Sequence, residues 1–282
     1  MSDSFEVWGS PIAHSLSPTL HRAAFAALGR DWTYNARDVP EAEFDAEWAA
    51  RSTALRGLSL TMPLKECVIP YLGHIDEVSG IVGAVNTVRV TAAGALGFNT
   101  DVWGAEQAMR DVLGDNKPDT AVMLGAGATA RSCAVALRNL GVRQLDVVVR
   151  TPARASELVA LAEKLGIAVT VHALDLVPPL HADIAVNTIP HGSDIPQAAV
   201  TAITTEALFD VVYANWPTDL AREWASRGAT VVSGLSMLAW QALRQQRIFA
   251  HHDPEQPLSD ETRVFAAMCA SVGLERPQGL KG

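Results

Sequence analysis

One strand–turn–helix segment constrains the fold of this chain more than any other feature. Residues 120–124 are mostly apolar, and an alanine-rich stretch with helical composition ends at Leu140. The turn between them is Gly125-Ala126-Gly127-Ala128-Thr129-Ala130. In such a GxGxxA turn the first glycine permits a tight turn, the second lets a phosphate approach the backbone, and the small third residue allows close helix–strand packing. An ordinary glycine turn can carry the same letters, but its place between a strand and a helix favours a dinucleotide site.

The same alternation of strands and helices runs along the rest of the chain. β-branched runs predict strands at 5–8, 55–61, 144–149, 169–172, 184–187, 207–212 and 230–232. Helices are predicted at 18–28, from about 63, at 101–113, 153–165, 237–249 and 259–271. This order is typical of an α/β protein with parallel strands. The length of 282 residues and the polar segment 114–118 suggest two βα domains followed by a helical tail.

Composition narrows the class of partner. Lys and Arg number 22 against 31 Asp and Glu, which gives a formal net charge of −9. An acidic chain is not expected to bind nucleic acid or an anionic membrane, and it contains no apolar run long enough to span one. The three cysteines are far apart and lack CxxC spacing, so neither disulfides nor a metal site are expected. With no signal peptide at the N-terminus, we expect a cytoplasmic protein that acts on a small molecule.

The strand predicted at 144–149 bears on which dinucleotide is bound. NAD-binding units usually place Asp or Glu after this strand to hold the ribose 2′-hydroxyl. Here Arg150, Thr151 and Arg154 follow, and no acid is present. Guanidinium groups suit a 2′-phosphate through bidentate hydrogen bonds, so NADP is the expected cofactor. The alternative, two solvated surface arginines, leaves the missing acid unexplained.

Two serines mark the start of the first predicted helix. Ser17 precedes Pro18, which predicts Ser17 as the N-cap and Pro18 as the first helical residue. Ser15 adds a second hydroxyl beside the same helix start, a neutral site suited to a carboxylate. One serine alone would be explained by capping, and His14 is expected to be an ordinary loop residue.

Lys65 and Asp101 are the candidate catalytic pair. Lys65 is one of only four lysines and follows Pro63, which predicts a position in the first turn of a helix. A cation there opposes the helix dipole, so either its charge is required or the side chain extends into solvent. Asp101 begins a helix, where an acid is stabilised in any case. As a partner it would hold the ammonium group of Lys65 in place, but spacing alone does not show that the two meet.

Taken together, these motifs resemble the shikimate dehydrogenase family from about Val7 to Ala270. The segments that carry the resemblance are 9–18, 61–65, 83–87, 99–101, 125–131, 150–151, 210–213 and 234–241. The resemblance implies an α/β fold with an N-terminal substrate domain, a Rossmann-type NADP-binding domain and C-terminal helices that return to the first domain. The implied domains are 1–101 with 237–282, and 102–236.

The resemblance also implies an activity, namely reversible NADP-linked oxidation of shikimate at its C3 hydroxyl. Reduction of 3-dehydroshikimate would be the biosynthetic direction, toward chorismate and the aromatic amino acids. The residues implied to hold the substrate carboxylate are Ser15, Ser17 and Tyr213. Those implied to address the ring hydroxyls and the ketone are Thr61, Lys65, Asn86, Asp101 and Gln241. Residues implied to contact the cofactor, besides the glycine turn and Arg150, Thr151 and Arg154, are Thr188, Val211, Gly234 and Met237.

Three positions depart from the commonest family pattern. Many members have Asn at the positions of Ser59 and Val149, and some have Gly at Ala128. The alternatives are a relative that uses quinate, aminoshikimate or NAD, a non-catalytic regulator that binds NADP or shikimate, and an NADP reductase of another substrate. Either a monomer or a homodimer fits the sequence.

Overall fold

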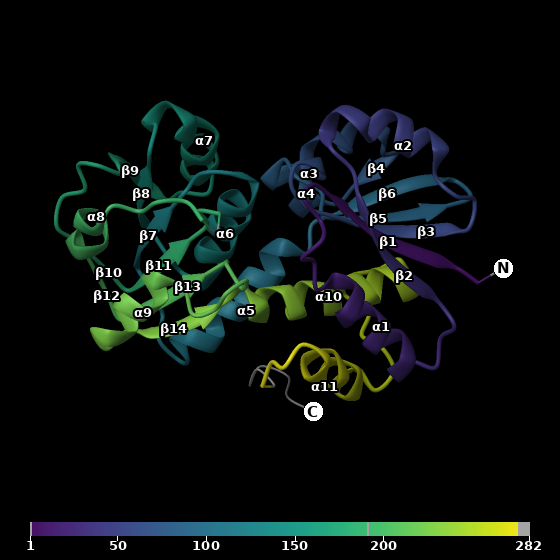
Figure 1. Cartoon of the computed structure of the whole chain (residues 1–282). Helices are drawn as coiled ribbons and strands as arrows, with labels where there is room; N and C mark the ends of the chain where they lie inside the picture. The colour runs from purple at the N-terminus through teal and green to yellow at the C-terminus, as the bar shows by residue number, and fades with distance from the viewer. Residues whose placement is uncertain (1, 191, 276–282) are drawn as a thin grey trace. The chain divides into compact units, whose positions relative to one another are not determined.

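The computed structural model describes residues 2–190 and 192–275 (Figure 1). The chain forms two compact units. Unit 1 contains residues up to Thr100 together with those from Leu238 onward, and unit 2 contains Asp101–Met237. Asp101 and Met237, which were expected in the substrate domain, therefore lie in unit 2. No helix in the described ranges is long and apolar enough to cross a membrane.

Unit 1 is built on a six-stranded sheet of order β2-β1-β3-β5-β6-β4. Its strands are β1 (Ser4–Gly9), β2 (Thr33–Asp38), β3 (Leu55–Leu60), β4 (His74–Ile75), β5 (Thr87–Thr91) and β6 (Gly94–Phe98). Its helices are α1 (Ser17–Ala27), α2 (Phe44–Ala50), α3 (Leu64–Cys67), α4 (Glu77–Val82), the part of α10 (Gly234–His251) from Leu238, and α11 (Glu261–Ser271). Strand β5 runs antiparallel to β3 and β6, whereas β1 is parallel to β2 and β3, and β4 is parallel to β6. The expectation of parallel strands is therefore wrong for β5 alone among the strands of this sheet. Only two residues join β5 to β6, too few for the crossover that parallel strands require.

The two faces of this sheet carry separate buried clusters. Trp8 packs with Phe44 and Trp48 on one face, whereas Phe5 and Phe249 pack on the other. Adjacent residues of a strand point to opposite faces, which is why β1 serves both clusters.

The C-terminal helices belong to unit 1 because α10 packs directly on its sheet. The Phe249 ring lies 4.7 Å from that of Phe5. A Cβ atom at Gly57 would lie 2.7 Å from the Phe249 ring, so the glycine leaves the space that this ring fills. Helix α11 packs on α1. The helical tail without further strands, expected from the sequence, is thus part of the first sheet's covering.

Unit 2 is built on a second six-stranded sheet, of order β14-β13-β11-β7-β8-β9, in which every pairing is parallel. Its strands are β7 (Thr120–Leu124), β8 (Gln144–Val149), β9 (Ala168–Ala173), β11 (Ile184–Asn187), β13 (Ala207–Asp210) and β14 (Thr230–Ser233). Its helices are α5 (Asp101–Leu113), α6 (Ala128–Leu140), α7 (Ser156–Lys164), α8 (Gln197–Ala202) and α9 (Asp219–Ser226). Two short strands, β10 (Leu180–Ala182) and β12 (Ile203–Thr205), pair separately. The predicted α/β class and the parallel Rossmann-type sheet are confirmed.

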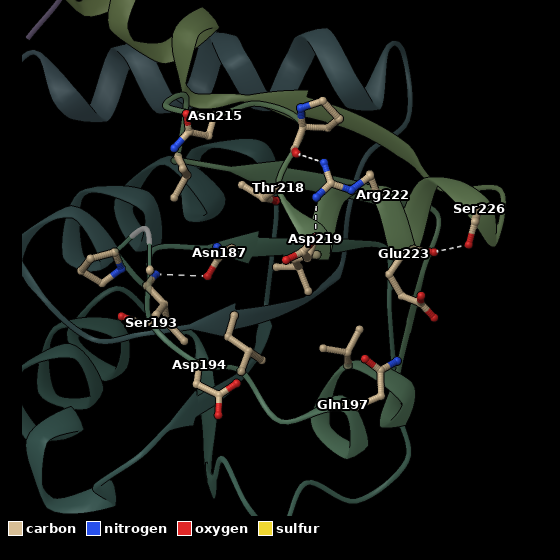
Figure 2. Close-up of a pocket in the computed structure, with 18 residues that line it drawn as sticks. Asn187, Ser193, Asp194, Gln197, Asn215, Thr218, Asp219, Arg222, Glu223 and Ser226 are labelled. Carbon is tan, nitrogen blue, oxygen red and sulfur yellow. Dashed lines mark hydrogen bonds and ion pairs between the residues drawn. The ribbon is translucent and has the colours of Figure 1, made fainter. Parts of the chain in front are cut away.

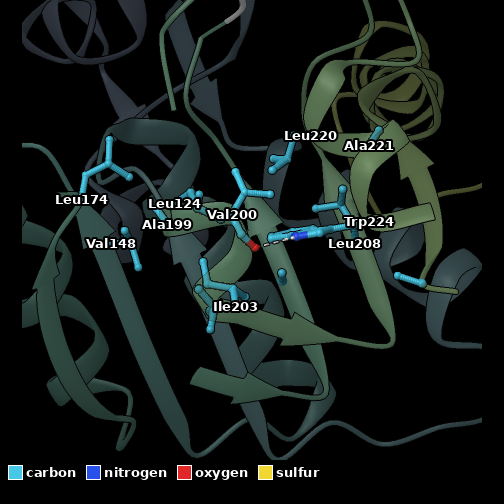
Figure 3. Packing of buried hydrophobic residues seen from close by; sticks show 13 residues of the cluster. Leu124, Val148, Leu174, Ala199, Val200, Ile203, Leu208, Leu220, Ala221 and Trp224 are labelled. Carbon is cyan, nitrogen blue, oxygen red and sulfur yellow. Dashed lines mark hydrogen bonds between the residues drawn. The ribbon is translucent and has the colours of Figure 1, made fainter. Parts of the chain in front are cut away.

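Helices α8 and α9 cover one face of this second sheet. Val200, Leu220 and Trp224 lie against Leu124 and Leu208 from the strands (Figure 3). The indole of Trp224 is buried and donates a hydrogen bond to the carbonyl of Val200 at 3.3 Å. The polar end of the largest side chain in the cluster is therefore satisfied.

Candidate functional site

The candidate cofactor residues of unit 2 follow the carboxyl ends of five adjacent strands. Arg150 follows β8, Gly125 follows β7, Thr188 follows β11, Val211 follows β13 and Gly234 follows β14. Because the strands are parallel, these five positions lie along one edge of the sheet. Neighbouring strands are about 4.8 Å apart, so the row is roughly 19 Å long. The strand order reverses direction between β7 and β11, which is where open α/β sheets bind dinucleotides.

The glycine turn has the geometry that a phosphate needs. Gly125 has φ +101°, and a Cβ atom there would overlap the Thr188 hydroxyl, which donates to the Leu124 carbonyl at 2.9 Å. Gly127 directly precedes α6, and no atom of residues 2–190 or 192–275 lies within 4 Å of the Cβ position it lacks. Among the residues that the structure describes, no side chain caps this helix, and Ala130 is fully buried. The first N–H groups of α6 are therefore free of side-chain caps beside an open space.

Arg150, Thr151 and Arg154 are exposed. Within the described chain, neither Arg150 nor Arg154 forms an ion pair, whereas Arg131 pairs with Glu157 at 2.8 Å. Two cations without a carboxylate partner, beside the turn that lacks the expected acid, fit a 2′-phosphate. NADP therefore fits the residues present at this edge.

A buried carboxylate that the sequence did not identify holds two of these loops. Asp210 is fully buried at the end of β13. Its Oδ1 accepts from Asn187 Nδ2 at 2.9 Å and from the Val212 N–H at 3.1 Å, and its Oδ2 accepts from the Thr218 hydroxyl at 2.7 Å. Asn187 in turn accepts from the Ile189 N–H at 3.1 Å. One carboxylate thus fixes the loops that follow β11 and β13.

The second half of the row is closely packed. The Val211 N–H donates to the Asn187 carbonyl at 3.0 Å. A Cβ atom at Gly234 would overlap the carbonyl of Val211, so only glycine fits at the start of α10. Met237, one turn further along α10, is 7% exposed. Burial raises the pKa of the half-buried Tyr213, which keeps its phenol protonated and able to donate a hydrogen bond to an anion.

A cavity of about 830 Å³ adjoins these loops within unit 2. It lies between the loop after β11, the loop after β13 and helix α9 (Figure 2). Ser193, Asp194, Asp219 and Glu223 line it, and Arg222 pairs with Asp219. None of the candidate cofactor or substrate residues lines this cavity.

In unit 1, backbone hydrogen bonds bring together three of the segments singled out in the sequence. Ser10 N–H donates to the Met62 carbonyl at 3.0 Å, which joins the serine loop to the end of β3. Val85 N–H donates to the Lys65 carbonyl at 2.8 Å, which places the backbone of Lys65 next to the residue that precedes Asn86. Thr61 and Lys65 are both half-buried.

Asn86 is buried and is held by hydrogen bonds on both ends of its amide. Its Oδ1 accepts from the Thr100 N–H at 2.8 Å, and its Nδ2 donates to the Thr100 hydroxyl at 2.9 Å. Nδ2 also donates to Gln241 Oε1 on α10 at 3.3 Å. The structure therefore brings Asn86 and Gln241 into contact, although they are far apart in the sequence.

The predicted cap of α1 is wrong by one position. The helix begins at Ser17 and its N-cap is Leu16, whose side chain forms no capping hydrogen bond to the described residues. Instead the Ser15 hydroxyl accepts from the Ser17 N–H at 3.3 Å, so the earlier serine satisfies the first helical donor. Ser15 is half-buried and Ser17 is 8% exposed, and His14 is exposed.

The helix predicted from about residue 63 is short. Helix α3 contains only four residues, with Pro63 as its N-cap, so Lys65 belongs to its last turn as much as to its first. The argument that Lys65 opposes a helix dipole therefore loses its force, because one turn has little dipole. Asp101 is the first residue of α5 and 1% exposed. Lys65 and Asp101 lie in different units, and their pairing stays a prediction.

Comparisons with known proteins identify the family of this chain. A family model for the shikimate dehydrogenase substrate-binding domain matches residues 7–88. A shikimate dehydrogenase (NADP(+)) from Methanothermobacter thermautotrophicus is 34% identical over 88% of this chain and 91% of its own length.

Solved structures extend the match over both units. The structure of Mycobacterium tuberculosis shikimate dehydrogenase matches with a TM-score of 0.81 and 35% identity, over 95% of this chain and 99% of that one. Shikimate 5-dehydrogenase from Thermus thermophilus, in complex with NADP(H) and shikimate, matches with a TM-score of 0.78 and 33% identity over 95% and 99% of the two chains. The resemblance seen in the sequence is confirmed, and the chain belongs to the shikimate dehydrogenase family.

Proposed function

We propose that this protein is an NADP-dependent shikimate dehydrogenase, which reduces 3-dehydroshikimate to shikimate reversibly. The observation that carries the proposal is the row of residues along the unit 2 sheet edge, from Arg150 through Gly125 and Thr188 to Gly234. Family members of known name act on shikimate with NADP(+), and a relative has been solved with both ligands. In this chain the same chemistry would use the cofactor residues at the edge of the unit 2 sheet and the polar residues of unit 1.

NADP would be held by backbone and side-chain groups along that row. The N–H groups at the start of α6 would bind the pyrophosphate, and Arg150, Thr151 and Arg154 would bind the 2′-phosphate. Val211, Gly234 and Met237 would line the nicotinamide end. When bound, the nicotinamide supplies or accepts the hydride.

The side chains of unit 1 would orient the substrate and move a proton. Ser15 and Ser17, with Tyr213 from unit 2, would donate hydrogen bonds to the carboxylate. Asn86 and Gln241, with Thr61, would bind the ring oxygens. Holding the reacting carbon in one position accounts for a large part of the rate of such a reaction.

Lys65 is proposed as the proton donor and acceptor at the C3 oxygen. In the reductive direction its ammonium group stabilises the developing alkoxide and delivers a proton to it. Asp101 would hold the ammonium group by charge. In the oxidative direction the neutral amine receives the hydroxyl proton.

The test is a panel of four assays on the purified protein. Absorbance at 340 nm is followed with shikimate or quinate as substrate, each with NADP+ or NAD+. Turnover with shikimate and NADP+ well above the other three pairs supports the proposal. Greater turnover with quinate or with NAD+ identifies a relative of different specificity. No turnover with any pair, together with a rise in Tm on adding shikimate or NADP+, identifies a non-catalytic regulator.

A further inference from the structure

A chain of buried polar side chains runs through unit 1 and ends at Asn86. None of its members is more than 5% exposed, and they come from α1, β2, β3, β5, the residue that precedes β5, and α10. The members are His21, Tyr34, Ser59, Thr87, Asn86 and Gln245. Burying a polar group lowers the stability of a protein unless the group is hydrogen-bonded. Six buried polar side chains that are hydrogen-bonded to one another therefore suggest a role in the site.

Gln245 is the centre of this chain. Its Oε1 accepts from the Ser59 hydroxyl at 2.8 Å and bonds His21 Nε2 at 3.0 Å. Its Nε2 donates to the Thr87 hydroxyl at 2.9 Å. All of the hydrogen-bonding atoms of the Gln245 amide therefore face the chain and not the substrate.

The hydrogen bonds of this chain are all donated in the same direction, toward Asn86. Tyr34 donates its phenol proton to Ser59 at 2.5 Å, so the Ser59 proton is directed at Gln245. Gln246 Nε2 donates to His21 Nδ1 at 2.5 Å, which leaves the ring proton of His21 on Nε2, facing Gln245. Burial lowers the pKa of His21 to about 3, so this neutral tautomer persists at neutral pH. Gln245 Oε1 thus receives two protons and its Nε2 must donate onward.

The Thr87 hydroxyl connects Gln245 to the side chain of Asn86. Because Thr87 accepts from Gln245, its own proton is free to be donated, and it goes to Asn86 Oδ1 at 2.8 Å. This bond and that from the Thr100 N–H fix Oδ1 as the acceptor. The Asn86 Nδ2 group then donates to the Thr100 hydroxyl at 2.9 Å and to Gln241 Oε1 at 3.3 Å. A long neutral bond can be exchanged for one to a ligand oxygen.

We propose that Gln245 and Thr87 are positioning residues, which set the orientation of the Asn86 amide so that its N–H₂ group faces the substrate hydroxyls. The inference rests on the proposed function, in which Asn86 binds the ring. Ser59 then has a defined role: its oxygen accepts a hydrogen bond from Tyr34, and its own hydroxyl proton is donated to Gln245.

The chain of hydrogen bonds can be broken at Thr87 while the shape of that side chain is kept. Thr87→Val replaces the hydroxyl with a methyl group, whereas Thr87→Ser keeps the hydroxyl. Thr87 is fully buried, so neither variant contacts the substrate. We expect Thr87→Val to lower kcat/KM for shikimate about tenfold, equivalent to about 1.4 kcal/mol, with KM for NADP+ unchanged, and Thr87→Ser to restore most of the loss. Ser79→Ala is the matched control, because the Ser79 hydroxyl is buried in unit 1 and has no partner in the described ranges; its kinetics should equal those of the wild type.

A double-mutant cycle separates positioning from simple destabilisation. If Thr87 acts through Asn86, Thr87→Val should have less than about a twofold further effect on kcat/KM in an Asn86→Ala background. Full additivity of the two losses would overturn the inference while leaving the proposed function intact. An inactive wild type would instead overturn the proposed function. In that event a crystal structure of Thr87→Val decides: a rotated Asn86 amide supports the positioning role, and an unchanged amide refutes it.

Discussion

At the scale of single residues, the site is defined by where charge is left without compensation. Most arginines of the described chain face a carboxylate, as Arg143 faces Asp119 at 2.5 Å. Arg150 and Arg154 do not, although the protein has an excess of acidic residues. A cation left unpaired beside an open glycine turn gains its partner when an anion binds. Discrimination between NADP and NAD should therefore reside in these two side chains.

We predict that Arg150→Gln with Arg154→Gln raises KM for NADP+ at least about tenfold, since two charge-assisted hydrogen-bonding groups are lost. KM for NAD+, which has no 2′-phosphate, should change less than about twofold. Steady-state kinetics with both cofactors measures the split. Arg143→Gln is the control, because Arg143 precedes β8 and so lies at the opposite edge of the sheet. Equal losses with the two cofactors would refute the assignment.

Lys65 is the second residue whose charge defines a role. Lys65→Met keeps the length of the side chain and removes the ammonium group. We expect turnover to fall by at least about 100-fold, because both the proton and the positive charge at the substrate oxygen are lost. Binding of NADPH, followed by its fluorescence, should remain unchanged. Lys164→Met, at the exposed end of α7, controls for loss of any lysine; near-normal turnover of Lys65→Met would contradict the role.

At the scale of elements, the turn between β7 and α6 separates folding from binding. Gly125 is required by the backbone, because its φ is +101° and a side chain would meet Thr188. Gly127 has an ordinary φ of −80° and open space at its Cβ position. The two glycines of one motif thus serve different purposes, and their variants should fail in different ways.

We predict that Gly125→Ala lowers the free energy of unfolding by on the order of 1–3 kcal/mol, the cost of a strained backbone conformation. Gly127→Ala should cost about 1 kcal/mol or less but should weaken NADP+ binding strongly, because its methyl group occupies the space of the pyrophosphate. Urea unfolding and titration calorimetry measure the two effects. Comparable loss of stability in both variants would show that Gly127 is needed for folding instead.

The elements of unit 2 could be predicted from sequence far better than those of unit 1. Strands β7, β8 and β11 and helix α5 have the bounds expected from their apolar runs, because a parallel sheet covered on both faces needs continuous apolar strands. Strand β2 was missed because only Tyr34 among its six residues is buried. Hairpin β5–β6 was missed because Gly94 and Gly97 weaken its strand pattern, although Gly97 leaves room that Leu72 and Val85 occupy.

The candidate site shows the same limit. Motif residues such as Gly125 and Arg150 follow strands and can be found from local pattern. Asp210 and Gln245 could not be assigned a role, because their partners come from segments distant in the chain. A buried Asp or Gln becomes recognisable only when tertiary structure supplies its hydrogen-bond partners.

At the scale of the whole molecule, unit 1 is built from two segments that are far apart in the sequence, one N-terminal and one C-terminal. Helix α10 supplies Phe249 to the core and Gln245 and Gln246 to the polar chain, and all three contact groups from the N-terminal part of the chain. His21 is where the two parts meet most closely, since its ring bonds both glutamines and stacks on Tyr34 at 4.2 Å. Protonating His21 would therefore disrupt the attachment of the C-terminal helices, and stability should depend on pH through this one group.

The sign of this dependence follows from the two states. Native His21 has its pKa lowered to about 3 by burial, the effect of which exceeds that of the opposing hydrogen bond to Gln245, whereas an unfolded histidine titrates near 6.5. Between these values the unfolded chain binds one more proton. The stability that His21 contributes is thus complete above about pH 6.5 and is lost as pH falls, by up to about 1.4 kcal/mol per pH unit.

We expect His21→Gln to be less stable than the wild type at pH 7.5 but to show a shallower decline in the free energy of urea unfolding between pH 6.5 and 4.5. Because every other titrating group is shared, the difference between the two slopes belongs to His21, and parallel pH profiles would mean that the native protein accommodates a charged ring without detaching α10.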